Sequence, residues 1–473
     1  MMKLLKQILN PRISPYVFSL ALLLITNNKA YIVIFAIYGL ILFTVNKFSL
    51  MESLFATLLL SLPFERGLRA WFIRVVSPGP HPWIPGYDFY FGIAPKMIIF
   101  VVLFFMLVLI KKGDGQKLKP IDFILLIFLL LSVIGTFVSE NSNLASLGLV
   151  RLFTSIGLFF VGSRLFIGER MRELFRNTLI AILLLLGIVG SLQLINRQPL
   201  GLFLEDSGAT RPLGYLTTDG EPFYRVSGLM GHPTFFGSFL TLLIPVSFGF
   251  LLSKKSKRWS SSKYVAVLAL TLGLISLFAT FSRSGWMAIV LSGMIFIWLG
   301  TKKNVRALKF WLLAAMIMII VVALSIFVPA FFSRLQSFND IWTIGNGRGR
   351  INLVLQAWEM IKQAPVWGVG LNRFTQVMST NDLSLEARGF LFPVHNTFLL
   401  FFSELGVTAG LLFLVFVVYI FWQSWKKIKN NWISTGIWVG AFTFLINAQF
   451  HTLFSQDPSL EVFILMLGYL STL

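Results

Sequence analysis

Four short stretches of the sequence carry residues that could bind an anion and move a proton. Two contain a single arginine among small residues: Arg225 in Arg-Val-Ser-Gly and Arg283 in Ser-Arg-Ser-Gly. The third is Arg348-Gly349-Arg350, and the fourth is His395-Asn396. A guanidinium group binds phosphate through two parallel hydrogen bonds, and histidine titrates near neutral pH. The pattern favours a phosphate-bearing ligand combined with general acid–base chemistry.

Each of these residues also has a structural interpretation. Arg225 and Arg283 could contact lipid headgroups, Arg348 and Arg350 could be solvated loop charges, and His395 could cap a helix. If His395 does stand at the amino end of a helix, an anion would be favoured beside it. Burial in an apolar surrounding would keep its ring neutral and able to accept a proton.

Further ionisable residues are given lesser roles. His232 precedes a proline, so we expect it to be structural rather than catalytic, and we group it with the substrate-binding candidates. His81 and His451 are interpreted as surface residues without an assigned role. Glu404 lies inside an apolar segment, where a carboxylate needs a partner. Arg151, at similar depth in another segment, is the candidate partner in a structural pair.

The sequence offers no evident site for a metal or a cofactor. It contains no cysteine, and none of its four histidines stands at the spacing of a zinc motif. A metal site would need assembly from distant residues. Walker and dinucleotide-binding fingerprints are also missing. We therefore expect a reaction that uses no metal and no cofactor, and whose energy comes from the substrate itself.

The elements that must position these residues are membrane helices. Hydrophobic residues make up 56% of the chain and charged residues 12%, against about 45–50% and about 25% in soluble domains. A bilayer requires about 17–25 apolar residues per helix. Candidate spans lie near 15–27, 30–46, 49–63, 93–110, 120–138, 144–166, 177–195, 232–252, 264–281, 285–300, 309–328, 395–421, 433–450 and 458–473. The first and third are short, so we predict an all-α polytopic membrane protein, one domain over 1–473, with 12–14 transmembrane helices.

The loop charges predict the orientation of these helices. With the amino terminus in the cytoplasm, most lysines fall on the inner side, as the positive-inside rule requires, and both termini are cytoplasmic. This distribution explains the net charge of +21 without nucleic acid. Most arginines and all four histidines fall on the outer side or within spans, which indicates an anionic ligand there. A long outer loop over 329–394 contains a helical pattern and the turn Gly368-Val369-Gly370, and such loops are usually functional.

At these residues the sequence resembles the O-antigen ligase and polymerase superfamily of polytopic glycosyltransferases. The resemblance covers about 190–425. It rests on the order of the Arg225 and Arg283 motifs, the late outer loop, Gly368-Val369-Gly370, and His395-Asn396 followed by Glu404 and Gly406. Ala409 and Gly410 depart from the ligase pattern, so the choice between ligase and polymerase stays open.

The resemblance implies an all-helical enzyme of the bacterial inner membrane whose active site faces outward. Its donor would be a glycan on undecaprenyl diphosphate. A ligase, which we favour, would use lipid A–core as acceptor, and a polymerase would use a lipid-linked glycan. Neither needs a nucleotide or an obligatory metal. Arg225 and Arg283 would hold the diphosphate, with Arg348 or Arg350 closing from the loop. His395 would be the general base of an inverting transfer, with Asn396 among the substrate-binding residues.

A lipid-linked oligosaccharide flippase is the alternative from another class. A flippase would need its charged residues in a central cavity open alternately to both sides, and two similar halves. Here the candidate residues are predicted at one surface, and one outer loop is much larger than the others. These features favour an enzyme.

Overall fold

The structure is a computed structural model of the chain. It describes residues 10–26, 28–62, 71–74, 90–93, 95–110, 119–202, 205, 215–218, 221–253, 261–301, 346–380, 392–429, 431–451 and 459–473.

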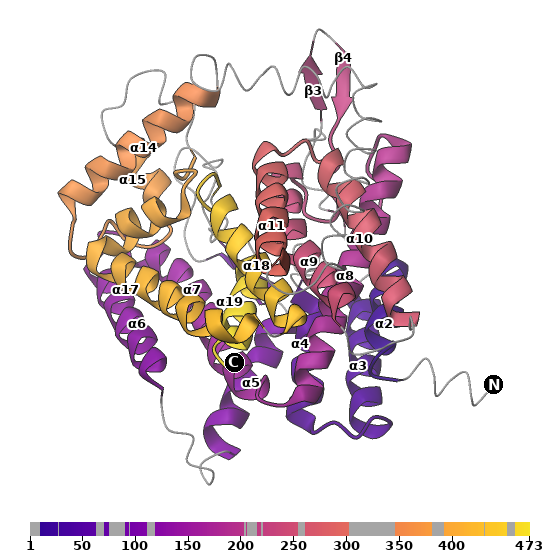
Figure 1. The fold of residues 1–473 in the computed structure, drawn as a ribbon. Helices are drawn as coiled ribbons and strands as arrows, with labels where there is room; N and C mark the ends of the chain where they lie inside the picture. The colour runs from indigo at the N-terminus through magenta and orange to yellow at the C-terminus, as the bar shows by residue number, and fades with distance from the viewer. Residues whose placement is uncertain are drawn as a thin grey trace.

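Helices make up most of the described chain (Figure 1). The amino-terminal helices are α2 (Ser14–Ala21), η1 (Leu22–Leu24), α3 (Asn28–Thr44), α4 (Leu50–Ser61) and α5 (Pro95–Ile110). The middle helices are α6 (Pro120–Val138), α7 (Ser142–Leu165), α8 (Glu169–Asn196), α9 (Pro233–Leu252), α10 (Ser261–Ala279) and α11 (Arg283–Thr301). The last are α14 (Asn346–Gln363), α15 (Phe374–Thr380), α17 (Thr397–Ile428), α18 (Trp432–Asn447) and α19 (Ser459–Leu470).

Two short antiparallel hairpins interrupt the helices. Strand β1 (Trp71–Arg74) pairs with β2 (Tyr90–Ile93), and β3 (Tyr215–Thr218) pairs with β4 (Glu221–Tyr224). Each hairpin lies in a stretch between two predicted spans. The strands are only four residues long, and Tyr224 at the end of β4 packs into the helical core, so the all-α class is unchanged.

Six helices are long and apolar enough to cross a membrane: α6, α7, α8, α9, α10 and α17. Six shorter apolar helices lie in the regions 14–24, 30–44, 50–61, 283–299, 432–447 and 459–470. The all-α polytopic membrane fold is therefore confirmed. The span predicted at 309–328 lies outside the described residues.

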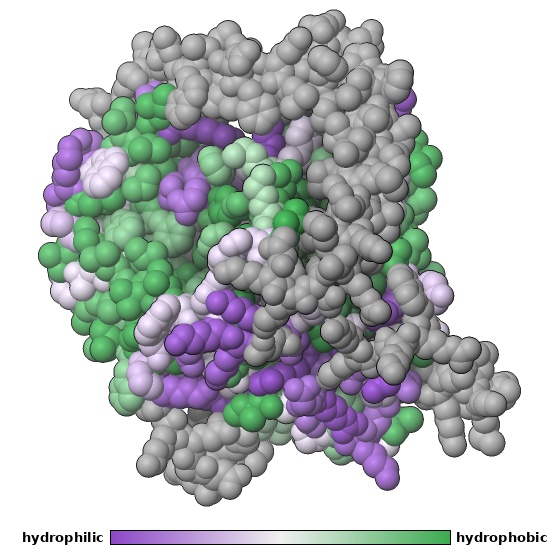
Figure 2. All heavy atoms as spheres, in the orientation of Figure 1, coloured by the Kyte–Doolittle hydropathy of each residue, from purple (hydrophilic) through white to green (hydrophobic). Residues whose placement is uncertain are grey.

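An apolar surface suited to lipid covers one flank of the molecule. Figure 2 shows a broad hydrophobic area on the side where α6 and α17 lie in Figure 1, with hydrophilic residues above and below it. Its exposed side chains include Leu126 and Leu130 of α6 and Val415 and Val418 of α17. Large exposed apolar side chains on two long helices are expected where the solvent is hydrocarbon.

Contacts at the ends of α6 and α7 show that these two helices run antiparallel. At one end, Arg164 of α7 donates to both carboxylate oxygens of Asp122 at the start of α6, at 3.1 and 2.6 Å. At the other, Arg373 of the predicted outer loop donates to Ser139 and Glu140, which lie between α6 and α7. This second end also carries β3–β4 and α14 (Figure 1), and we call it the hairpin end.

Helices α9 and α18 pack backbone to backbone in the core. A Cβ on Gly440 would lie 2.3 Å from the carbonyl oxygen of Leu242, so only glycine permits this approach. Pro245 removes the N–H that would bond the carbonyl of Thr241, and the Thr443 hydroxyl lies 3.1 Å from that carbonyl instead. The close pairing fixes the two helix ends that position His232 and His451.

Candidate active site at the hairpin end

The segment between β4 and α9 is fixed to the ends of α8 and α10. Gln193 of α8 donates to the carbonyl of Gly228 at 2.9 Å and accepts from its N–H at 2.8 Å. Gly228 has a φ of +57°, and a Cβ there would lie 2.5 Å from the Phe236 ring, which explains the glycine of this motif. Arg225 donates from Nε to the carbonyl of Thr280 at 2.8 Å. Its guanidinium is thereby held beside the second arginine motif.

A tight turn between α10 and α11 places Arg283 at the first residue of α11. Phe281 takes the left-handed conformation that closes the turn, with a φ of +51°. The hydroxyls of Ser282 and Ser284 lie 3.2 Å apart, and Ser284 Oγ lies 2.8 Å from Nε2 of His451. The turn that carries Arg283 is therefore joined to the segment that follows α18.

His395 stands just before α17, two residues after Pro393. Its Nδ1 lies 3.1 Å from the carbonyl oxygen of Pro393. A carbonyl only accepts, so Nδ1 carries the proton and Nε2 is left as the basic nitrogen. This tautomer is the one a general base requires.

Asn396 is the N-cap of α17. Its Oδ1 accepts from the backbone N–H groups of Phe398 and Leu399, both at 3.0 Å, and its amide donates to Gln449 at 3.1 Å. These contacts give it a structural task at the helix start. The predicted role in substrate binding stays a prediction.

His451 lies at the centre of the cluster, and its interpretation as a surface residue is wrong. The residue is 8% exposed, and its ring centroid lies 6.5 Å from that of His395. Its backbone carbonyl accepts from the Thr397 hydroxyl at 2.8 Å, which ties it to the start of α17. Nothing in the local sequence gave this position, because it results from the packing of α18 against α9 and α17.

The two histidines share a positively charged, dehydrated environment. Burial first, and then the charge of the nearby Arg350, lower the pKa of His395 to about 4, while its hydrogen bond to Pro393 acts the other way. The pKa of His451 is lowered by burial, then by the charges of Arg350, His395, His232 and Arg225. Among the described residues, the charged groups acting on His451 are thus all basic, and the site suits an anion.

The remaining predicted residues fall around this cluster. Arg350 lies in α14, and both burial and the charge of Arg283 lower its pKa. His232 is the N-cap of α9 and accepts from the N–H of Thr234 at 3.1 Å, in line with the structural role expected of it. Arg348 also lies in α14, but its side chain is outside the described residues, as is His81.

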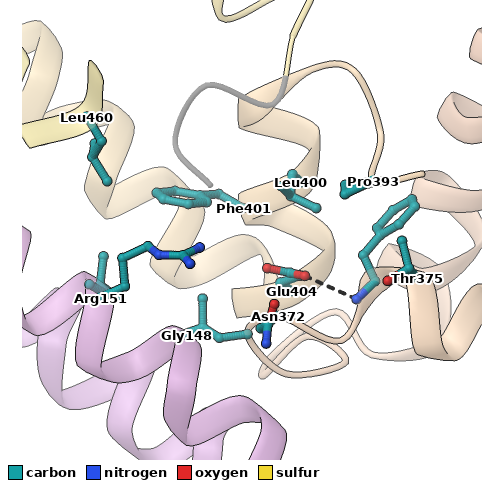
Figure 3. Close-up of a pocket in the computed structure, with 12 residues that line it drawn as sticks. Gly148, Arg151, Asn372, Thr375, Pro393, Leu400, Phe401, Glu404 and Leu460 are labelled. Atoms are coloured by element: carbon teal, nitrogen blue, oxygen red, sulfur yellow. Dashed lines mark hydrogen bonds between the residues drawn. The ribbon is translucent and has the colours of Figure 1, made fainter. Parts of the chain in front are cut away.

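A second feature, a polar pocket, lies between α7, α15 and α17. Glu404 and Arg151 face one another across it, and Phe401 and Leu400 form part of its wall (Figure 3). Glu404 Oε1 accepts from the backbone N–H of Phe374 at 3.1 Å. The structure thus brings the two predicted partners to one pocket, while the structural role assigned to them stays a prediction.

Three glycines shape the backbone next to the pocket residues Glu404 and Leu371. Gly406 interrupts α17 with a φ of +81°, and the turn at Gly368 and Gly370 inserts against the break. Val369 N donates to the carbonyl of Ser403 at 2.9 Å, and Gly370 N donates to that of Glu404 at 3.0 Å. A Cβ on Gly368 would lie 2.4 Å from the Glu404 carbonyl, which explains the glycine.

No group of three or more histidine, aspartate or glutamate side chains that could hold a metal gathers within the described ranges.

Comparison with known families agrees with this arrangement. Residues 265–414 match a family model described as O-antigen ligase. This part of the chain is similar to the O-antigen ligase family. The resemblance to the O-antigen ligase and polymerase superfamily is confirmed over this range, and with it a membrane enzyme of the glycosyltransferase type. A comparison with curated proteins gives no match.

The matched range runs from α10 into α17 and includes Arg283, Arg350 and His395. Arg225 and His451 lie outside the matched range and reach the site through the packing of α9 and α18. The wider boundaries predicted from the sequence, 190–425 for the core and 329–394 for the loop, stay predictions.

Proposed function

We propose that this protein transfers a glycan from undecaprenyl diphosphate to an acceptor hydroxyl on the outer face of the bacterial inner membrane. The acceptor is lipid A–core, as for an O-antigen ligase. One observation carries the proposal: Arg225, Arg283, Arg350 and His395 lie around a buried His451 at a single end of the helix bundle.

The arginines serve the donor. Departure of the glycan leaves a diphosphate whose charge needs compensation, which many enzymes supply with a divalent ion. Here Arg225 and Arg283 bind the diphosphate from the ends of α10 and α11, and Arg350 or Arg348 approaches from α14. A donor aimed at charge that develops in the transition state typically contributes about 3–4 kcal/mol.

His395 serves the acceptor. The acceptor oxygen forms a bond to the anomeric carbon, the bond from that carbon to the diphosphate oxygen breaks, and the hydroxyl proton passes to Nε2 of His395. Undecaprenyl diphosphate leaves with the bonding electrons. Attack from the face opposite the diphosphate inverts the anomeric centre. Such general base catalysis contributes about 10²–10⁴-fold.

The distribution of charge supports an outward-facing site. Lys119, Lys263, Lys426 and Lys427 lie at the starts or ends of helices at the end opposite the hairpins. Lysine-rich ends tend to stay in the cytoplasm, which supports an arginine–histidine cluster that faces outward. Both termini are then cytoplasmic.

The test is glycan transfer by purified protein in lipid vesicles, with polyprenyl-diphosphate glycan as donor. His395→Ala is expected to lower transfer about 10²–10⁴-fold while the protein stays folded. Gln449→Ala is the matched control, because it removes a contact of the neighbouring Asn396 and leaves the proposed base intact. Unimpaired transfer by His395→Ala would remove the base role.

The same assay separates the alternatives. Transfer to lipid A–core identifies a ligase, and transfer to a second lipid-linked repeat unit identifies a polymerase. Movement of the lipid-linked glycan across the vesicle membrane without transfer would identify a flippase and overturn the proposal.

A further inference from the structure

The pocket that holds Glu404 and Arg151 is lined by residues other than the arginines proposed to bind the donor. Glu404 is 7% exposed and lies inside α17, one of the six long apolar helices. Ionisable side chains within such helices are costly and in most proteins serve a function. Glu404 accepts from the backbone N–H groups of Phe374, Asn372 and Arg373, contacts that a neutral oxygen acceptor can also make.

Unusual backbone conformations also occur next to this pocket. The break at Gly406 and the turn at Gly368 and Gly370, all with positive φ, bring Phe374 and Asn372 against Glu404. Residues in sparsely populated conformations persist where the surroundings determine them, and they gather at ligand sites.

The pocket lies directly beside the proposed base. Pro393 lines the pocket, and its carbonyl oxygen is the one that Nδ1 of His395 contacts at 3.1 Å. A ligand in the pocket would therefore extend toward His395 along the start of α17.

The arginines of the donor site reach the cluster from other helices. Arg225 and Arg283 are held at the ends of α10 and α11, whereas the pocket is formed by α7, α15, α17 and Leu460 of α19. In Figure 1, α18 lies between α17 and α11. An inverting transfer requires the nucleophile to enter opposite the leaving group, so the acceptor needs a site separate from the one that binds the diphosphate.

We propose that this pocket binds a sugar of the acceptor and directs its hydroxyl to His395, an inference that rests on the proposed glycosyl transfer. The Glu404 carboxylate and the Arg151 guanidinium accept from and donate to the sugar hydroxyls. Phe401 offers an apolar surface to the C–H face of the ring. Convergent polar groups on an apolar wall are the usual composition of a small-molecule site.

The experiment measures transfer kinetics with each substrate varied in turn. The donor is polyprenyl-diphosphate glycan, and the acceptor is purified lipid A carrying its core oligosaccharide. Glu404→Gln keeps an acceptor for Phe374 N–H and removes the charge, and Arg151→Gln tests the opposite wall. Glu359→Gln is the matched control, because that carboxylate is exposed on α14 and pairs with the exposed Lys362.

We expect both pocket variants to raise the KM for the acceptor about 10- to 100-fold, the loss typical of one hydrogen bond to a charged group. The donor KM and the kcat at saturating acceptor stay within about twofold of wild type. Glu359→Gln leaves all three constants unchanged.

Two results would overturn the inference. One is an unchanged acceptor KM in both variants. The other is a fall in kcat with both KM values unchanged, which would assign Glu404 and Arg151 to the positioning of α15 and its neighbours. If Glu404→Gln does not fold, the acceptor KM of Arg151→Gln decides. A wild-type protein that transfers nothing would instead contradict the proposed function, and binding of the lipid A–core acceptor to wild type and Arg151→Gln would then be measured directly.

Discussion

The charge of Arg350 should set the pH at which His395 loses its ability to accept a proton. In the unliganded protein, burial lowers the pKa of His395 from 6.5 to about 4, with Arg350 as the next contribution. That fall corresponds to about 3 kcal/mol against the charged imidazole. Replacement of Arg350 by glutamine removes one of the two causes and leaves burial in place, so the pKa should rise by about one unit.

The expected effect is a displaced acid limb in the profile of kcat/KM against pH, which reports groups of the free enzyme. With a pKa of about 4, about nine-tenths of His395 is neutral at pH 5, and with a pKa of about 5, about half is. Relative to its own value at pH 7.5, Arg350→Gln should therefore lose about half of its kcat/KM at pH 5, whereas wild type loses about a tenth. The assay is transfer by purified protein between pH 4.5 and 8.

Arg350→Lys is the matched control, since it keeps the charge and should keep the acid limb of wild type. The absolute rates of both variants will fall, because Arg350 also approaches the diphosphate, but the shape of the profile is independent of that loss. A limb that stays in place, or moves to lower pH, in Arg350→Gln would refute the assignment of the limb to His395. So would a wild-type limb near 6.5.

Three further predictions concern the elements that hold the cluster. Arg283→Lys should lower kcat/KM about 10²–10³-fold although the charge is kept, because an ammonium group does not reproduce the guanidinium fork. The control, Arg197→Lys at an exposed position after α8, should leave transfer unchanged. Activity of Arg283→Lys equal to that of wild type would contradict bidentate binding. Gly228→Ala should destabilise the protein by about 1–3 kcal/mol, because the added Cβ would clash with the Phe236 ring and the backbone φ is +57°. The measurement is thermal unfolding in detergent. An unchanged unfolding midpoint would show that the segment carrying Arg225 can rearrange. His451→Ala should lower kcat about 10²-fold, because Ser284 and the turn that carries Arg283 lose their contact with His451. His451→Gln can still form a hydrogen bond to Ser284 and should recover part of the lost kcat. Identical losses of kcat in the two variants would assign His451 a direct role in place of a positioning one.

The residues that could be predicted from sequence are those whose signal is local. An arginine among small residues beside an apolar segment, or a histidine before one, stands out because charge is rare in this chain. Arg225, Arg283 and His395 were found in this way, and the structure gathers them at one end. The helices themselves follow from apolar length, which is a strong signal at this composition.

His451 could not be found in the same way, and the reason is physical. Its environment is made by Ser284, Thr397 and His395, which are 167, 54 and 56 positions away in the sequence. The backbone contact of α9 with α18 at Gly440 brings that environment about. The sequence signal of a close contact between helices is a small residue at the interface. This signal is weak, because glycines are frequent in membrane helices for many reasons.

Glu404 shows how the local sequence can indicate a buried carboxylate and its partner without indicating the pocket in which they lie. The sequence indicated a carboxylate in an apolar helix and named Arg151 as its partner, which the structure places across the same pocket. The break in α17 at Gly406 was not foreseen. The turn at Gly368 packs against this break, next to Glu404, which lines the pocket. Pro393 lines this pocket and also contacts His395, so Glu404 lies near the proposed base. A carboxylate that only stabilised the fold would not need this position. The acceptor kinetics of Glu404→Gln therefore test whether the break in α17 exists for substrate or for packing.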